Sequence, residues 1–283
     1  PALVFQSSLS TNLTTRKPPF PVAQYGFSVY GLPSSTAMNL ILIDIGNTRT
    51  KFVLASSDGF VDRTYCATRA INATKVREIT KSWSNLASKV VLCSVVPDRN
   101  TAFKEVFGND LLVVAHDVPL GIGIDYPNPA SIGADRLANA AAMARLYGQP
   151  GVAIDFGTAV TFDILSSEGK YVGGVIAPGV ELMNDYMSER TALLPRVEII
   201  PSPPVIGRST ESAMQSGAFH GYLGMVRNIL AEVLQTFDAP EEVAVIATGG
   251  ASPMFAKALE IPVEQELVLC GLRFIAEANQ LIS

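Results

Sequence analysis

Two short segments of the sequence place a carboxylate and a glycine directly after an apolar strand. In the first, which reads LILIDIGNTRTKF, Asp44 and Gly46 interrupt two runs of apolar residues. In the second, which reads GVAIDFGTAVTF, Asp155 and Gly157 stand in the same relation. Because glycine permits turns closed to other residues and lets backbone N–H groups approach an anion, each segment is a candidate phosphate-binding turn.

The side chains around the first turn extend this chemistry. Asn47 and Thr48 carry short polar groups that can donate hydrogen bonds to phosphate oxygens. Lys51 follows Arg49 by two residues in the next strand, so both can present positive charge on the same face. Since a carboxylate would repel phosphate, we expect Asp44 to bind a divalent cation, or its water, that bridges to the phosphate. The first turn therefore predicts a magnesium–phosphate site.

The two turns belong to an internal repeat. After each turn the hydrophobic pattern indicates hairpin-linked strands followed by alternating helices and strands. Two such halves predict an α/β protein whose domains face each other across a cleft, where ligands are usually held. The second turn would face the first, with Thr158 donating to another part of the phosphate chain. The alternative is a pair of purely structural hairpins, since Asp-x-Gly is common in β-turns.

The elements that must position these turns can be placed along the chain. In the first half, strands are expected over 39–45, 49–55, 60–66, 89–95 and 111–115, and helices over 72–86, 98–107 and 133–147. In the second half, strands are expected in GVAIDFGTAVTFDIL, KYVGGVIAP and VAVIATGG, and helices near 179–192 and 209–236 and after the last strand. Trp83 is expected in the core, on the amphipathic helix over 72–86.

A third glycine signal lies at the end of the last expected strand. Gly249 and Gly250 follow a buried strand and precede a helix, so they would let the backbone approach a flat base or a ribose. Such a turn between a strand and a helix is also common in proteins without a nucleotide site. This signal supports a nucleotide site only in combination with the two Asp-Gly turns.

The first 37 residues differ from the remainder of the chain. They are rich in Ser, Thr and Pro and contain only Arg16 and Lys17 as charged residues, whereas the strand pattern begins directly after Met38. We expect residues 1–37 to be an N-terminal extension, such as a translated upstream stretch or a flexible tail; a weak organelle-targeting signal is the alternative. The first domain is then expected over 38–150 and the second over 151–283.

Composition excludes several classes of protein. The formal charge of −5 lacks the basic footprint of a general nucleic-acid binder, and no apolar run approaches the ~18 residues that a membrane helix needs. The 3 cysteines are an odd number without a CxxC motif, so we expect ordinary thiols in a reducing cytoplasm, with no structural zinc or disulfide framework. His116 and His220 have no carboxylate or cysteine companions in the sequence and are expected at the surface or an interface.

Taken together, these segments resemble the sugar-kinase, Hsp70 and actin superfamily, and more narrowly the type III pantothenate kinases. The matching segments, in the order of the family, are DIGNTRTK, DYPNPASIGADRLANA, DFGTAVTFD, YVGGVIAPGV, STESAMQSG and VIATGG. They cover nearly all of the chain from Met38 onward; the family often has Asn or Lys where Ser209 stands. The resemblance implies two ribonuclease-H-like domains, each with a mixed sheet, in an actin-like ATPase architecture.

The resemblance also implies a function. It indicates an ATP-dependent kinase that phosphorylates pantothenate in the first step towards coenzyme A, acts as a homodimer and requires Mg²⁺ and a monovalent cation such as K⁺ or NH4⁺. The ATP-binding residues would be Asp44, Ile45, Gly46, Asn47, Thr48, Arg49, Thr50, Lys51 and Thr158. The pantothenate-binding residues would be Tyr126, Gly133, Ala134, Asp135, Arg136 and Thr210. Asp135 would accept the proton, and Asp155 would bind the monovalent cation.

The chemistry of the substrate agrees with two of these assignments. Pantothenate is an anion with a primary hydroxyl, so its site needs a cation and a proton acceptor, and the adjacent Arg136 and Asp135 offer both. At a helix start, we expect the helix dipole to keep Asp135 ionised, which makes it a weak base. A weak base suffices because the transition state of phosphoryl transfer is loose. The alternative is that both residues merely cap the helix.

Other functions remain open at this point. A non-catalytic nucleotide-binding regulatory accessory protein could use the same fold, but it would be expected to lose Asp44, Asp135 or Asp155, and all three are present. An Hsp70- or actin-like ATPase would need longer insertions than this chain has. A different acceptor, such as a sugar, is also possible because the fold does not fix the acceptor.

Overall fold

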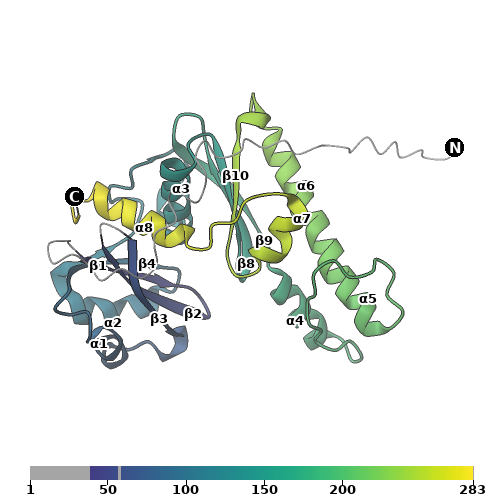
Figure 1. Cartoon of the computed structure of the whole chain (residues 1–283), viewed down its shortest axis with the longest axis horizontal. Coiled ribbons are helices and arrows are strands. Elements are labelled where there is room, and N and C mark those ends of the chain that lie inside the picture. The colour runs from purple at the N-terminus through teal and green to yellow at the C-terminus, as the bar shows by residue number, and fades with distance from the viewer. Residues whose placement is uncertain (1–38, 57–58, 283) are drawn as a thin grey trace.

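Two five-stranded mixed sheets form the framework of the protein (Figure 1). The computed structural model describes residues 39–56 and 59–282, so the expected N-terminal extension over 1–37 lies outside the described residues. The first sheet has the order β3-β2-β1-β4-β5 and the second the order β10-β7-β8-β9-β6. This arrangement confirms the predicted α/β class with a mixed sheet in each half.

The strands and helices have the following bounds. The first sheet contains β1 (Asn39–Ile45), β2 (Arg49–Ser56), β3 (Gly59–Ala67), β4 (Ala87–Ser94) and β5 (Leu111–Val113). The second contains β6 (Gly123–Ile124), β7 (Gly151–Phe156), β8 (Ala159–Leu165), β9 (Lys170–Pro178) and β10 (Ala244–Thr248). The helices are α1 (Ala73–Thr80), α2 (Pro97–Phe107), α3 (Ala134–Leu146), α4 (Val180–Arg190), α5 (Thr210–Ser216), α6 (Tyr222–Leu234), α7 (Ser252–Leu259) and α8 (Leu267–Ala278). None of these helices is long and apolar enough to cross a membrane.

The internal repeat is visible in how the central strands are paired. In the first sheet β1 pairs antiparallel with β2 and parallel with β4. In the second sheet β7 pairs antiparallel with β8 and parallel with β10. Each Asp-Gly turn thus connects a central strand to its antiparallel neighbour, at corresponding positions of the two sheets.

The first sheet is buried on both faces, which explains the uninterrupted apolar run of β1. Leu40 and Leu42 face one core cluster, and Ile41 and Ile43 face another, as the two-residue period of a strand requires. The cluster around Ile41 is completed by side chains of α1 and α2, including Phe103.

Helices α3 and α8 lie between the two sheets and connect their cores (Figure 1). One core cluster joins Leu42 of β1, Ala138 of α3, Leu272 of α8 and Ile246 of β10. In addition β6, from the first half of the sequence, pairs with β9 of the second sheet, and α8, from the second half, packs on β1 and β4. The exact boundary between the expected domains stays a prediction.

Two expected helices differ from the structure. The helix expected over 72–86 ends at Thr80, because Ser84 and its neighbours form turns in which the Ser84 hydroxyl donates to the carbonyl oxygen of Lys81. Trp83 is nevertheless buried, as expected, and its Nε1 donates to Asp62 Oδ2 at 3.0 Å. The helix expected over 209–236 is divided into α5 and α6 by a π-helical turn, Gly217–Gly221.

We predict that Gly271→Ala weakens the contact between α3 and α8. A Cβ at Gly271 would lie 1.9 Å from the carbonyl oxygen of Ala138, so the helices would have to separate at a cost of about 1–3 kcal/mol in the free energy of unfolding. Urea unfolding measures this loss. The matched control is Gly224→Ala in the exposed part of α6, where nothing lies within 4 Å of the added Cβ, and which should stabilise by about 0.5–1 kcal/mol. An unchanged stability of Gly271→Ala would contradict the close packing.

Candidate active site

A single cleft of about 490 Å³ lies between the ends of the central strands of both sheets. It is lined by Asp44, Gly46, Asn47, Thr48, Arg49, Lys51, Val95, Asp135, Asp155, Gly157, Thr158, Ala159, Thr161, Thr248, Gly249, Gly250, Gln265 and Val268. Both Asp-Gly turns, the late glycines and the first turn of α3 therefore meet in one place. The structure brings together most of the residues expected around ATP, together with the expected base.

The first turn is braced from behind by Thr68. The turn itself is closed by a hydrogen bond from the Gly46 backbone N–H to the carbonyl oxygen of Arg49, at 3.1 Å. The hydroxyl of Thr68 donates to the carbonyl oxygen of Gly46 at 2.7 Å, and the backbone N–H of Thr68 donates to the carbonyl oxygen of Thr48 at 3.0 Å. Sequence reasoning missed Thr68, because nothing in the sequence indicates that this distant residue lies behind the turn.

Two of the residues expected to bind ATP do not line the cleft. Ile45 and Thr50 are both fully buried, and the Thr50 hydroxyl lies 3.0 Å from that of Thr68. Their side chains alternate with Asp44 and Lys51 along the strands and point away from the cleft. Any contribution of Ile45 and Thr50 to nucleotide binding would have to come from their backbones.

The second turn is packed against the late glycine pair. A Cβ at Gly249, whose φ is +88°, would lie 2.3 Å from Asp155 Oδ1 and 2.7 Å from the backbone nitrogen of Phe156. The backbone of Ala251 then donates to the carbonyl oxygen of Phe156 at 3.1 Å. Because Gly249 has no side chain, its segment can lie directly against the second turn. Gly250, in contrast, has open space around it.

The carboxylates in the cleft are buried close to one another. Burial, opposed by Lys51 but assisted by Asp135 and Glu266, raises the pKa of Asp44 to about 6. Burial, assisted by Asp135 and other carboxylates, raises the pKa of Asp155 to about 7. A cleft with this excess of buried negative charge favours the binding of cations.

The oxygen atoms that line the cleft suit a cation that is bound partly by the protein and partly by another molecule. Carboxylate oxygens such as those of Asp44 and Asp155 are hard donors suited to Mg²⁺ and to alkali cations. However, within residues 39–56 and 59–282 no group of three or more Asp, Glu, His or Cys side chains could hold a metal ion by itself. The remaining ligands would therefore have to be water, backbone or phosphate oxygens.

Asp135 lies in the first turn of α3 and faces the cleft. The N-cap of α3 is Gly133, which makes no side-chain cap, and Asp135 Oδ1 accepts a hydrogen bond from the backbone of Arg136 at 2.9 Å. Burial raises the pKa of Asp135 and outweighs this hydrogen bond and the charge of Arg136. The expectation that the helix dipole makes Asp135 a weak base is therefore wrong, because desolvation dominates and makes it a stronger base than an ordinary aspartate.

Arg136 is held by a buried carboxylate that sequence reasoning did not identify. Its Nε donates to Asp163 Oδ1 at 2.6 Å, and its Nη2 donates to the carbonyl oxygen of Phe162 at 3.2 Å. The other oxygen of Asp163 accepts from Asn139 Nδ2 at 3.2 Å. Since the side chain of Asp163 is fully buried, it fixes the direction of the guanidinium. Arg136 is thus more than a helix cap.

The residues expected to bind pantothenate do not all lie together. Tyr126 and Arg136 meet around Tyr171: the guanidinium lies 5.6 Å from the centroid of the Tyr171 ring, and the Tyr126 ring meets it edge-on at 6.1 Å. We call Tyr126, Arg136 and Tyr171 the acceptor cluster. A Cβ at Gly174 would lie 2.3 Å from Arg136 Nη2, so the Gly-Gly pair of β9 permits this packing.

Thr210 is separate from the acceptor cluster. It is the exposed first residue of α5, on an arm that projects from the body of the protein, and it is not among the residues that line the cleft (Figure 1). Gly133 and Ala134 do not line the cleft either; a Cβ at Gly133 would lie 2.6 Å from Asp135 Oδ1. Their expected roles at the substrate stay predictions.

Comparison with known proteins assigns the family. Residues 40–232 match the family model of the type III pantothenate kinases. The type III pantothenate kinase of Akkermansia muciniphila is 43% identical over 245 residues, which cover 86% of this chain and 100% of the relative. That of Methylacidiphilum infernorum is 42% identical over 240 residues, which cover 84% of this chain and 88% of the relative.

Solved structures confirm the fold at lower identity. A Baf family transcriptional activator from Campylobacter jejuni has a TM-score of 0.56 at 19% identity, over 86% of this chain and 100% of that chain. A protein described as an N-acetylmannosamine kinase, from Listeria monocytogenes, has a TM-score of 0.53 at 11% identity, over 86% and 100% of the two chains. With the family model matched over more than half of its length, the chain belongs to the type III pantothenate kinase family.

Proposed function

We propose that Asp135 accepts the proton of the pantothenate hydroxyl while the cleft holds the ATP that phosphorylates it. The protein is a kinase, and the reaction of its family is the ATP-dependent phosphorylation of pantothenate, the first step of coenzyme A synthesis. The observation that carries the proposal is that Asp44, Asp135 and Asp155, from three separate elements, line one cleft. None of the described residues favours a non-catalytic accessory role.

The first turn is suited to the phosphates of ATP. Backbone N–H groups and the side chains of Asn47 and Thr48 can donate hydrogen bonds there, and Lys51 adds a positive charge. Asp44 would hold Mg²⁺, directly or through water, and Mg²⁺ would neutralise charge on the phosphate oxygens when bound. Thr158, from the opposite turn, would donate to another part of the phosphate chain.

Asp135 and Arg136 would act on different ends of pantothenate. Asp135 faces the cleft, and its raised pKa makes it a better proton acceptor than an exposed aspartate. Arg136, held by Asp163, points its guanidinium into the acceptor cluster, where it would hold the carboxylate or amide end of pantothenate. Positioning of this kind supplies much of the rate enhancement when the transition state is loose.

Asp155 would bind the monovalent cation. Its carboxylate is buried beside like charges, so a K⁺ or NH4⁺ ion would relieve the repulsion without demanding the strict octahedral geometry of Mg²⁺. The free thiols of Cys66, Cys93 and Cys270 fit a reducing compartment, and we place the protein in the cytoplasm. Neither a nucleic acid nor a membrane is proposed as a partner.

We also propose that the protein is a homodimer joined through its arm, which we define as residues 180–216. The arm exposes apolar side chains: Leu182, Tyr186, Met187, Leu193, Val205 and Ile206. Ile206 is 82% exposed and Leu193 88% exposed. Monomeric proteins rarely expose so many apolar side chains in one region, and such a region is typical of a surface that binds a protein. Thr210 lies on this arm, so we propose that it acts towards the cleft of the second copy.

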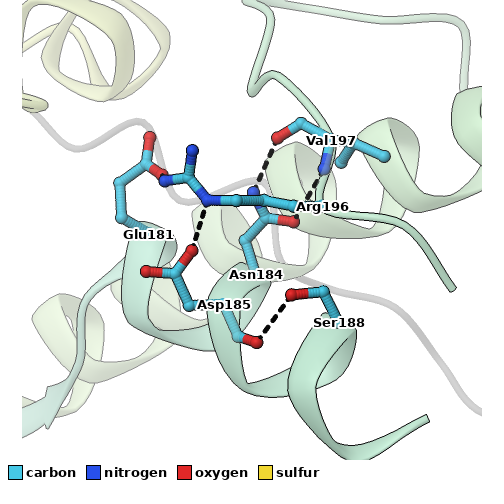
Figure 2. Close-up of polar contacts among 6 residues, drawn as sticks. All are labelled: Glu181, Asn184, Asp185, Ser188, Arg196 and Val197. Atoms are coloured by element: carbon cyan, nitrogen blue, oxygen red, sulfur yellow. Dashed lines mark hydrogen bonds and ion pairs between the residues drawn. The ribbon is translucent and has the colours of Figure 1, made fainter.

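Polar contacts hold the arm in shape, as Figure 2 shows. The side chain of Asn184 is buried; its Nδ2 donates to the carbonyl oxygen of Val197 at 2.6 Å, and its Oδ1 accepts from the backbone of Val197 at 3.3 Å. Arg196 donates to Glu181 at 2.9 Å and also to Asp185. The apolar side chains are thus presented on a fixed support, which lowers the entropic cost of binding.

The first prediction of this proposal concerns Asp135. Release of ADP from ATP should require pantothenate, Mg²⁺ and K⁺ together, and Asp135→Asn should lower kcat by roughly 10²–10⁴-fold, because a general base contributes about that factor. A coupled ADP-release assay measures kcat, with sugars as alternative acceptors, and calorimetry with ATP should show binding by the variant. Full activity of Asp135→Asn would show that Asp135 is not the proton acceptor.

The same assay tests the cation. Full activity with Na⁺ in place of K⁺ would count against the role of Asp155.

The second prediction is that Asp155→Asn stabilises the cation-free protein while impairing the enzyme. The pKa of Asp155 is raised from 3.8 to about 7, so between about pH 4 and pH 7 the native state holds a proton that the unfolded state has lost. Its stability therefore falls as the pH rises through this range. At about pH 8 the variant should be more stable by roughly 1–3 kcal/mol.

Urea unfolding without K⁺ at about pH 8 and about pH 5 tests this pH dependence, and the difference between variant and wild type should shrink at the lower pH. Asp117→Asn, at an exposed carboxylate, is the control and should leave stability unchanged. A difference of the same size at both pH values would contradict burial of the charge.

The third prediction concerns the arm. Leu182→Asp combined with Tyr186→Asp should convert the dimer into a monomer, because both side chains are exposed in a single chain and only an interface would bury the new charges. Light scattering should give about twice the chain mass of 30.1 kDa for the wild type and the chain mass for the variant. Leu86→Asp, at another exposed leucine, should remain dimeric. A wild-type monomer would refute the dimer.

A further inference from the structure

A short segment before α8 crosses from the second sheet to the first at the edge of the cleft. We call this segment, residues 263–266, the strap. Val263 forms a bridge with Ala247 of β10, and the backbone of Glu264 donates to the carbonyl oxygen of Ala247 at 2.8 Å. Gln265 Nε2 donates to Ser252 Oγ at 2.7 Å, at the start of α7. The strap is thus anchored up to Gln265 on β10 of the second sheet and on α7 beside it.

The next residue, Glu266, contacts the first sheet instead. Its Oε1 accepts a hydrogen bond from Arg63 Nη1 of β3 at 2.9 Å, and its Oε2 lies 3.8 Å from Lys51 Nζ of β2. Lys51 is directly opposite Asp44 in the pairing of β1 and β2, so the two side chains share a face. The ammonium group of Lys51 therefore lies among carboxylates of the cleft and of the strap.

The carboxylate of this ion pair is incompletely satisfied. Glu266 Oε2 is enclosed and makes no hydrogen bond, since the distance to Lys51 exceeds hydrogen-bonding range. An ammonium group has three donors, so Lys51 can remain beside Glu266 and still donate to a phosphate oxygen. Glu266 is not among the residues that line the cleft and would act only through Lys51.

We propose that Glu266 is a positioning residue that holds Lys51 at the mouth of the cleft in the orientation that receives the phosphates of ATP. This inference rests on the proposed function only in taking ATP as the ligand of the first turn. It adds a coupling between the sheets, because the strap fixes Glu266 to the second sheet while its carboxylate holds a side chain of the first. Lys51 is thereby placed relative to both turns.

Glu266→Gln tests the inference because it removes the charge and keeps the shape. We expect the Kd for a non-hydrolysable ATP analogue, measured by calorimetry, and the KM for ATP to rise roughly three- to tenfold. The kcat and the KM for pantothenate should stay within about twofold. In a Lys51→Met background, Glu266→Gln should have no further effect on ATP affinity. Glu277→Gln removes the carboxylate that pairs with Arg273 at 3.7 Å on the same helix; it is the matched control and should bind ATP as the wild type does.

Several outcomes would overturn the inference. One is an unchanged or tighter affinity of Glu266→Gln for the analogue. An unchanged affinity would show that Glu266 does not contribute to ATP binding, and a tighter one would show that its charge repels the phosphates. Another is an equal loss in the Lys51→Met background, which would show that Glu266 does not act through Lys51. Because binding is measured without an acceptor, a wild type that binds ATP but fails to phosphorylate pantothenate would refute the proposed function and leave this test valid. A wild type that does not bind ATP would refute both.

Discussion

The burial of several carboxylates in one cleft is the constraint around which the site is built. Asp44, Asp135 and Asp155 are brought into one cleft, where burial raises the pKa of all three, and Asp135 raises the pKa of Asp44 and Asp155 further. Placing like charges in a poorly solvated site costs free energy that the fold must supply elsewhere. The same cost favours the neutralisation of these carboxylates by a bound cation or a proton. The cleft thus lowers the free energy of unfolding, as functional sites commonly do.

The packing of α3 against α8 connects the two sheets around the cleft. Small residues allow the helices to approach so closely that the backbone of Ala138 contacts Gly271. Because both helices also contribute to the core shared by the sheets, the two Asp-Gly turns have a defined separation. The strap that precedes α8 adds polar contacts to both sides of the cleft.

Local features of the site could be predicted from the sequence, whereas features that depend on sheet register could not. The two turns were predictable because an apolar strand followed by Asp-x-Gly is a local pattern, and so was the repeat that places them in corresponding positions. Asp163 was missed because its pairing with Arg136 depends on how β8 lies beside α3. The error over the basicity of Asp135 has a related cause, since desolvation depends on the whole fold while a helix start can be read locally. Glu266 was missed for the same reason, because it meets Lys51 only in the folded chain.

The adjacency of Asp135 and Arg136 has a consequence for selectivity. Consecutive residues of one helix are separated by a fixed rise and rotation, and Asp163 restrains the longer of the two side chains. In the proposed reaction, the distance between the carboxylate of Asp135 and the guanidinium of Arg136 is therefore limited by their adjacency in α3 and by the contact with Asp163. A molecule whose alcohol and anionic ends are too near or too far apart could satisfy one residue only. Under the proposed function, α3 therefore selects acceptor molecules by the distance between their hydroxyl and their anionic end.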